Sequence, residues 1–280
     1  MTDWDAERYH RLSSPQLGWG RRVLERLAPV PGERILDLGC GTGRLTAELV
    51  AAATDGFIVG VDRSESMIQE AAARQPSPLG PHRLEAEVPG GRTGRSSAHF
   101  VRADGASLPF ADAFDAVLST ATFHWIRDHD ALFASIYRAL VPGGRLVAQC
   151  GGGPNLRRLL DRAAALTRQS SFARYFKGWT DPWEFADVPT TMQRLDRAGF
   201  TLIDVYLEEA PTTLPDRPSY RDFLSCVCIR EHLARMPERQ QGAFLDALAD
   251  DAATDSPPFT LDYWRLNILG TKPAGVEQAA

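Results

Sequence analysis

Short apolar runs and amphipathic stretches alternate along residues 34–150. The first run, 35–38, lies between Gly32 and Gly39, which is typical of a buried strand. Between the runs, apolar residues recur every three or four positions, which is typical of a helix packed on one side. The alternation predicts an α/β fold, with a doubly wound, mostly parallel sheet and helices on both faces. The predicted strands cover residues 35–38, 57–61, 99–103, 113–119 and 145–150.

Three helices are expected between these strands. The first begins at Arg44, directly after a glycine-rich turn, and the second follows Ser64, whose hydroxyl suits a helix N-cap. The third is expected to reach Leu140 and to stop at the Pro142-Gly143-Gly144 sequence. The residues expected to form buried stripes are Leu45 and Leu49 in the first helix, Met67, Ile68, Ala71 and Ala72 in the second, and Leu132, Ile136 and Leu140 in the third.

The chain continues with a weaker version of the same pattern. A helix is predicted over 190–198 and ends at Gly199. The apolar segments 200–210 and 259–273 predict two further strands. These strands bring the predicted sheet to seven strands.

Three segments fall outside the alternating pattern. Residues 151–188 and 215–258 are mostly helical by pattern and rich in Trp, Phe and Arg, and we expect them to form a helical cap that selects the substrate. Residues 75–97 hold four prolines and four glycines, which predicts a mobile surface insertion. The chain as a whole, 1–280, is expected to form a single domain.

The turn after the first strand concentrates the candidate chemistry. In the sequence DLGCGTG, Gly39, Gly41 and Gly43 allow positive φ and let backbone N–H groups approach a ligand at a helix N-terminus, which favours anionic groups. A dinucleotide fingerprint has a small residue where this chain has Arg44. The spacing and the acidic Asp37 suit a ligand with a zwitterionic amino-acid end better than a pyrophosphate.

Acidic residues also follow the next two strands. Asp62 follows strand 57–61, where an acidic side chain can bind the vicinal hydroxyls of a ribose, and Asp104 follows strand 99–103. Alternatively, Asp62 is a solvated strand-end carboxylate and Asp104 caps a local turn before glycine. Because the carboxyl ends of parallel strands converge on one crevice, we expect both carboxylates at a shared nucleoside site.

The DLGCGTG sequence resembles the first motif of the class I S-adenosylmethionine-dependent methyltransferases. Within that family, WDAERYHRLSSPQ near the N-terminus, the block FHWIRDHDALFASIYRALVPGGRLVAQ and the final RLNILGTKP are similar to the trans-aconitate methyltransferase-like branch, or methyltransferase type 11. The resemblance implies that 34–150 is the cofactor-binding core and that the last strand is inserted antiparallel. The branch more often has Asn-Ala-x-x-Gln-Trp where this chain has TATFHW at 120–125, so the acceptor's identity is not implied.

By this resemblance the cofactor is S-adenosyl-L-methionine, and its site residues can be named. Asp62 would bind the ribose, Asp104 would accept from the adenine amine, Ala106 would supply a backbone N–H, and the carbonyl of Thr120 would lie near the methionine amine. Tyr9 would cap the methionine carboxylate, unless it is a plain packing residue. The full implied set is Tyr9, Asp37, Gly39, Cys40, Gly41, Asp62, Arg63, Met67, Asp104, Gly105, Ala106 and Thr120.

The resemblance implies methyl transfer to a small-molecule acceptor, most simply O-methylation of a carboxylate or hydroxyl. A sulfonium donor is already activated, so the protein mainly aligns the acceptor and excludes water. A carboxylate is ionised at neutral pH and needs no base, whereas for another acceptor His124 is the candidate catalytic base, unless it is a structural histidine. Phe123 and Trp125 could wall the methyl site, with a core role favoured for Trp125. Arg174 and Lys177 could pair with an anionic acceptor or simply be solvated.

Composition narrows the choice of function. The net charge of −5 argues against a nucleic-acid partner, and the four cysteines lack zinc-ligand spacing, so no metal site is expected. The N-terminus lacks the apolar core of a signal peptide and no apolar run could span a bilayer, so we expect a cytoplasmic monomer or homodimer with no membrane partner. Two other functions stay open: a non-catalytic S-adenosylmethionine-binding sensor or accessory protein, and a nicotinamide-dependent oxidoreductase, which Arg44 disfavours.

Overall fold

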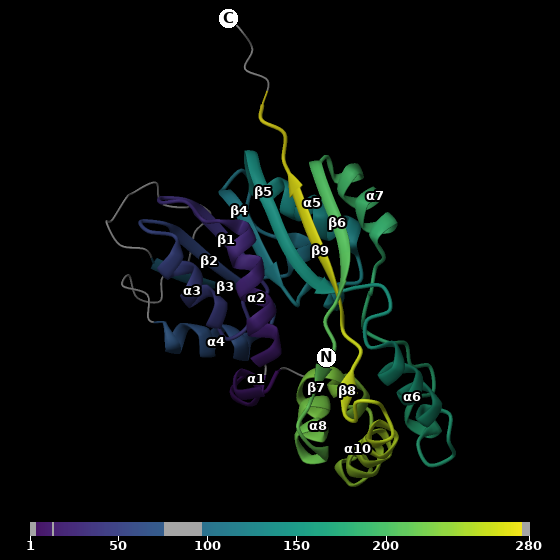
Figure 1. Cartoon of the computed structure of the whole chain (residues 1–280). Helices are drawn as coiled ribbons and strands as arrows, with labels where there is room; N and C mark the ends of the chain where they lie inside the picture. Colours follow the sequence, from purple (N-terminus) through teal and green to yellow (C-terminus); the bar gives the residue numbers. More distant parts are fainter. Residues whose placement is uncertain (1–3, 13, 76–96, 276–280) are drawn as a thin grey trace, which may run out of the picture.

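A seven-stranded sheet forms the centre of the computed structural model, which describes residues 4–12, 14–75 and 97–275 (Figure 1). Its strands are β1 (Arg34–Leu38), β2 (Phe57–Asp62), β3 (Ser97–Arg102), β4 (Phe114–Thr120), β5 (Leu140–Gly151), β6 (Thr201–Glu209) and β9 (Trp264–Thr271). Their order is β3-β2-β1-β4-β5-β9-β6. The first five are parallel, and β9 runs antiparallel to both β5 and β6. The predicted sheet with an inserted antiparallel last strand is therefore confirmed.

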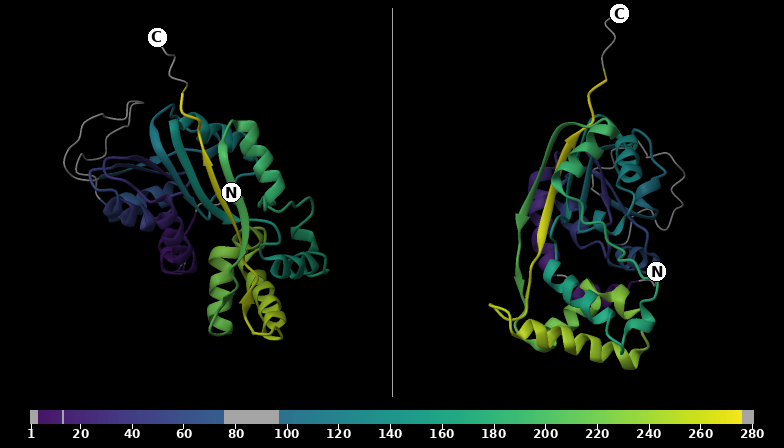
Figure 2. Two further views of the ribbon diagram at one scale, coloured as in Figure 1. Left: turned by 45° about the horizontal axis from the view of Figure 1, so that its top comes forward. Right: turned by 90° about the vertical axis from the view of Figure 1, so that its right-hand side faces the viewer.

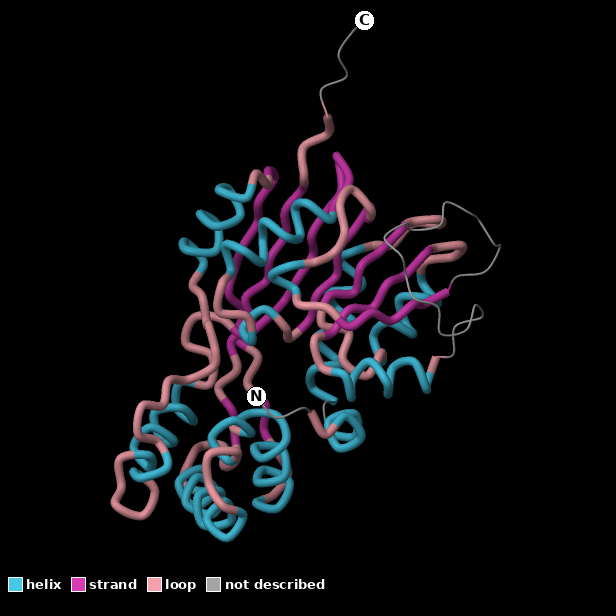
Figure 3. Tube along the Cα trace, turned by 180° about the vertical axis from the view of Figure 1, so that it is seen from behind, coloured by secondary structure: helices cyan, strands magenta, loops and turns pink. Residues whose placement is uncertain are grey.

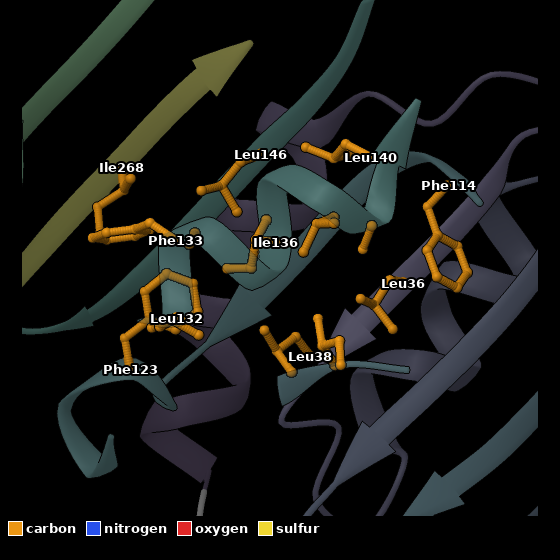
Figure 4. Packing of buried hydrophobic residues seen from close by; sticks show 14 of the residues in the cluster. Leu36, Leu38, Phe114, Phe123, Leu132, Phe133, Ile136, Leu140, Leu146 and Ile268 are labelled. Atoms are coloured by element: carbon orange, nitrogen blue, oxygen red, sulfur yellow. The ribbon is translucent and has the colours of Figure 1, made fainter. Parts of the chain in front are cut away.

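Helices cover both faces of the sheet, because consecutive side chains of each strand point to opposite sides. In β1, Ile35 packs with buried residues of α2 and α3, whereas Leu36 and Leu38 pack with α5. Figure 3 shows the face that α5 and α7 cover, and Figure 4 shows α5 side chains meeting those of the strands. The helices are α1 (Ala6–Leu12), α2 (Ser14–Leu27), α3 (Arg44–Ala52), α4 (Glu65–Arg74), α5 (His129–Ala139) and α7 (Val188–Ala198).

The buried stripes follow the prediction with two exceptions. Ser64 caps α4 as expected, its hydroxyl accepting from the Met67 N–H at 3.2 Å, but Ile68 is only half-buried and Ala72 is exposed. The stripe of α4 is therefore narrower than predicted, because this helix contacts β2 and β3 near the edge of the sheet. The residues confirmed as buried are Leu45, Leu49, Met67, Ala71, Leu132 and Ile136.

Two predicted boundaries are wrong because long-range strand pairing overrides the local pattern. Leu140 is buried as expected, but it does not end α5; it pairs with Phe114 as the first residue of β5, so the Pro-Gly-Gly sequence lies inside that strand. The predicted strand 259–273 is divided into β8 (Thr260–Leu261) and β9, and β8 pairs with β7 (Thr212–Thr213) outside the main sheet.

The segments 151–188 and 215–258 form helices on the side of the sheet where the parallel strands end (Figures 1 and 2). We call them the helical cap. They share a hydrophobic core of their own, which includes Leu159, Phe176, Tyr220 and Phe244. The cap elements are α6 (Arg157–Thr167), η3 (Ala173–Tyr175), α8 (Arg217–Phe223), the π-helical turn η4 (Leu224–Cys228), α9 (Arg230–Leu233) and α10 (Glu238–Ala253).

Two expectations concern segments outside this core. The predicted insertion 75–97 lies almost entirely outside the described residues, since 76–96 are not described. Among the helices that the structure describes, none combines the length and the apolar character needed to cross a bilayer.

Candidate active site

A cavity lies at the carboxyl edge of the parallel strands. The segments that follow β1, β2, β3 and β4 form its walls, together with residues at and before α1. These segments are distant in sequence, so the sheet topology brings them together. The predicted site residues that line this cavity are Tyr9, Gly39, Gly41, Asp62, Arg63, Met67, Asp104, Gly105 and Thr120.

The glycine turn after β1 adopts a shape that side chains would obstruct. Gly39 has a φ of 77°, and a Cβ at this position would lie 1.9 Å from the Thr122 hydroxyl oxygen. Gly41 has a φ of 54°, and a Cβ there would meet no atom within 4 Å, because the residue faces the open cavity. Directly beside Gly39, the Thr122 hydroxyl donates to the Thr120 carbonyl at 2.9 Å. The turn therefore presents bare backbone to a ligand.

The carboxylate of Asp62 is held between two loops. Its Oδ2 accepts from the Gly41 N–H at 3.0 Å, and its Oδ1 accepts from the Ser64 N–H at 2.9 Å. These hydrogen bonds fix the side chain at the end of β2, where it lines the cavity and stays half-buried. Asp62 thus links the glycine turn to the start of α4.

Asp104 caps a local turn before Gly105, as the alternative interpretation of its sequence predicts. Its Oδ1 accepts from the Ala106 N–H at 2.9 Å, which caps the 3₁₀ turn η1 (Gly105–Ser107). Asp104 is exposed and lines the cavity, whereas Ala106 lines an adjoining, wider cleft instead. The Ala106 N–H is therefore already used within the turn.

Two predicted residues of the glycine turn lie behind the cavity wall. Asp37 is 2% exposed and does not line the cavity; its Oδ2 accepts from the Thr46 hydroxyl at 2.6 Å. Burial raises the pKa of Asp37 to about 6, and the nearby Asp62 adds to the shift. Cys40 is also buried and lines an adjoining small cavity, which shares Gly39 and Gly41 with the first. Burial raises the pKa of its thiol well above the usual value. Neither side chain lines the first cavity, so both can support the turn from behind, and their expected contact with the cofactor stays a prediction.

The helix α1 brings Tyr9 over the cavity. Arg44 ties this helix down, its guanidinium donating to the His10 carbonyl at 2.7 Å, and the His10 ring nitrogen Nδ1 lies 2.9 Å from the Thr42 hydroxyl. Burial raises the pKa of Tyr9 to about 12, with a further contribution from Asp62. Arg44, which disfavours a dinucleotide fingerprint, thus has a positive role in docking α1.

Trp125 separates the first cavity from a second one. It is half-buried in the 3₁₀ turn η2 (Phe123–Trp125), lines both cavities, and lies edge-on to Trp4 with ring centroids 5.4 Å apart. Phe123 is fully buried in the sheet core instead (Figure 4). The expectation favoured Trp125 for the core; the structure gives that position to Phe123, because residues of so short a turn face opposite ways.

The ring of His124 lines the second cavity but is not free to act as a base. Its Nδ1 accepts a hydrogen bond from the Gly151 N–H at 3.2 Å, so the proton of the neutral ring resides on Nε2. Burial lowers the pKa of His124 well below its usual value, and Arg265 and His129 lower it further. These contacts favour the alternative role of His124, that of a structural histidine, over the expected catalytic base.

Two polar residues of the second cavity were missed by sequence reasoning. Arg265, at the start of β9, is 2% exposed, and Gln16 of α2 has a buried side-chain oxygen without a hydrogen-bond partner. Arg174 and Lys177, the expected partners of an anion, are exposed and line neither cavity. Only the position of Arg265 within RLNILGTKP, inside a predicted buried strand, could have singled it out.

The sequence matches the model of a family described as a methyltransferase domain over residues 36–148. It is 30% identical to the trans-aconitate 2-methyltransferase of Methylobacterium nodulans, over 92% of each chain. It is also 30% identical to an uncharacterized methyltransferase of Schizosaccharomyces pombe, over 75% of each chain.

The fold is similar to that of solved structures. The phosphoethanolamine N-methyltransferase 2 of Haemonchus contortus, solved with S-adenosyl-L-methionine, superposes with a TM-score of 0.57 at 20% identity. The match covers 96% of this chain and 56% of that one. At this identity the likeness concerns the fold alone.

Proposed function

The chain belongs to the class I S-adenosylmethionine-dependent methyltransferases, in the trans-aconitate methyltransferase-like branch, and we propose that it methylates an oxygen of a small carboxylate. Membership makes it a methyltransferase that uses S-adenosylmethionine, which sets aside the oxidoreductase alternative. The carboxylate acceptor and the individual site residues are our proposals, and the observations below support them.

The residues of the first cavity fit an adenosyl amino acid. We assign Asp62 to the ribose hydroxyls, because its carboxylate is held at the end of β2 beside open space. Asp104 lies where it can accept from the adenine amine, and Gly41 leaves room for the ligand beside its backbone. The Tyr9 hydroxyl, protonated at neutral pH, can donate to the methionine carboxylate. Arg63, Met67, Gly105 and the Thr120 carbonyl complete the assigned set.

When bound, S-adenosylmethionine supplies a methyl group on a positively charged sulfur. In the proposed reaction a lone pair of the carboxylate oxygen forms the O–CH₃ bond as the S–CH₃ bond breaks, and sulfur keeps the electron pair. The negative and positive charges cancel, so the products are a neutral ester and a neutral thioether and no proton moves. The chain's task is to align the oxygen and exclude water, and Trp4 and Trp125, which line both cavities, are placed to do both.

One observation favours a carboxylate over a hydroxyl or amine: the second cavity offers no free base among the described residues. The Nδ1 lone pair of His124 is occupied by the Gly151 N–H. Burial raises the pKa values of Tyr9, Tyr263 and Cys228, so these groups stay protonated near pH 7. A hydroxyl or ammonium acceptor would have to lose a proton, whereas a carboxylate is already ionised.

The test is incubation of the full chain with isotope-labelled methyl donor and a metabolite extract. We expect a labelled small molecule whose label is released as methanol by mild alkali, because carboxylate esters hydrolyse and methyl ethers and amines do not. An alkali-stable methylated product would refute the carboxylate assignment. Binding of S-adenosylhomocysteine without any labelled product would favour the sensor alternative.

A further inference from the structure

We propose that Arg265 is the counterion of the acceptor carboxylate, and that the cavity around it selects a monocarboxylate with a flat apolar body over a polycarboxylate. This inference deepens the proposed function and rests on it. Here "acceptor pocket" means the second cavity, which His124, Trp183, Phe185, Tyr263, Arg265 and Gln16 line among others.

Arg265 is a buried cation without a counterion. Its guanidinium lies over the Trp19 ring at 4.4 Å, and its Nε is buried with no hydrogen-bond partner. Among the residues that the structure describes, no carboxylate comes within salt-bridge distance of it. Its cross-strand neighbour Glu208 faces Arg22 at 3.4 Å instead. A buried, unpaired charge is strongly unfavourable, so its presence indicates an anion that binds there.

The position of Arg265 suits an anion near the transferred methyl group. The acceptor pocket shares Trp4, Tyr9 and Trp125 with the proposed cofactor cavity, so the two are contiguous. Arg265 is near enough to Tyr9 for its charge to oppose the rise in that residue's pKa. Gln16 lines the same pocket and its side-chain oxygen has no hydrogen-bond partner, so rotation of the amide can turn an N–H toward a carboxylate. One carboxylate oxygen held by these donors leaves the other free to attack.

The remaining walls of the acceptor pocket are aromatic and uncharged. The rings of Trp183 and Phe185 are nearly parallel, 9° apart with centroids at 6.2 Å, and His124 stacks on Phe185 at 5.7 Å. Arg265 is the one charged side chain among the described residues that line this pocket. A second or third carboxylate would be desolvated against these rings with no partner. Flat apolar groups, in contrast, pack well against such faces.

The test measures binding as well as turnover on the full chain loaded with S-adenosylhomocysteine. The probes are benzoate, cinnamate, hexanoate and octanoate, with trans-aconitate as the polycarboxylate and cinnamamide as the uncharged match to cinnamate. We expect benzoate or cinnamate to raise Tm and to bind more tightly than hexanoate, octanoate and trans-aconitate, and cinnamamide to do neither. With S-adenosylmethionine, the same order is expected for kcat/KM.

Variants distinguish the role of Arg265 in acceptor binding from any effect on cofactor binding or folding. Arg265→Met should weaken binding of the preferred monocarboxylate by about 30-fold or more, with partial recovery in Arg265→Lys. The affinity for S-adenosylhomocysteine should stay within about twofold, since the proposed cofactor residues are unchanged. The ligand-free Tm should not fall, because the substitution removes an unpaired buried charge. Arg174→Met, at an exposed arginine outside the pocket, is the matched control and should behave as the parent chain.

Each of the other possible outcomes would refute a different part of the inference. Tighter binding of trans-aconitate than of every monocarboxylate would refute the selectivity but leave carboxylate methylation standing. Equal binding of cinnamamide, or an unaffected Arg265→Met variant, would refute the counterion role. No binding by any monocarboxylate would refute the inference as a whole. Failure of the proposed function looks different, since the labelled product from the extract would then be stable to alkali.

Discussion

Substitution of Asp62 tests the proposed cofactor site most directly. In Asp62→Ala, the Gly41 and Ser64 N–H groups lose their shared acceptor, and the proposed ribose contacts are lost with it. A hydrogen bond to a charged group contributes about 1.5–3 kcal/mol, and part of this is recovered by water at a half-buried position. A net loss of about 3 kcal/mol corresponds to about 100-fold weaker binding of S-adenosylhomocysteine.

Isothermal titration calorimetry on folded protein measures this effect, with circular dichroism as the check on folding. Asp62→Asn should lie between the parent and Asp62→Ala, because its amide nitrogen must face one of the two N–H donors and cannot accept from it. Glu65→Gln is the matched control, since this nearby exposed carboxylate pairs with Arg102 on the surface at 3.1 Å. Affinity within twofold of the parent in a folded Asp62→Ala variant would refute the ribose assignment.

Three further predictions concern the support of the site. The pKa of Asp37 is about 6 in the folded chain against 3.8 for the free group, so its charge destabilises the fold above pH 6 and this effect disappears as pH falls toward 3.8. Asp37→Asn should therefore raise the free energy of unfolding by about 3 kcal/mol at pH 8 and by nearly nothing at pH 4. An equal effect at both pH values in urea titrations would contradict this sign. Gly39→Ala should lower the free energy of unfolding by about 3 kcal/mol or more, because the added Cβ would clash with Thr122 and the φ at this position is 77°. Thermal unfolding that matches the parent would show that the turn relaxes freely. Arg44→Met should loosen α1 from the glycine turn and raise the Kd for S-adenosylhomocysteine by about tenfold in a fluorescence titration. A Kd equal to the parent's would mean that α1 docks without this contact.

The sheet and the first cavity follow from local signals, and the sequence therefore predicts them well. The glycine turn, the strand-end acids and the N-cap at Ser64 each depend on residues close together in the chain. The features that the sequence does not predict depend on partners that are distant in the chain. The Asp37 side chain turns toward Thr46 of α3 instead of the cavity, and the division of the last strand follows from the pairing of β8 with β7.

The acceptor pocket is hard to predict from the sequence because charged side chains are usually exposed to solvent. The aromatic segment around Arg174 and Lys177 suggests partners for an anion, yet both side chains are exposed. Arg265 lies in an apolar strand and is buried, against the general tendency of arginine. His124 has the residue type of a base, and only the three-dimensional contact with Gly151 reveals that its lone pair is used.

The place of β9 in the sheet has a consequence for how the chain acquires its structure during synthesis. In the described sheet β6 has a single neighbour, β9, so β6 cannot pair until a strand some 60 residues later in the chain has been synthesised. The half that holds the proposed cofactor cavity can fold before then, because β1 to β5 pair among themselves. The arginine proposed to hold the acceptor arrives with that late strand, so a nascent chain gains its donor crevice before it can bind anything to methylate.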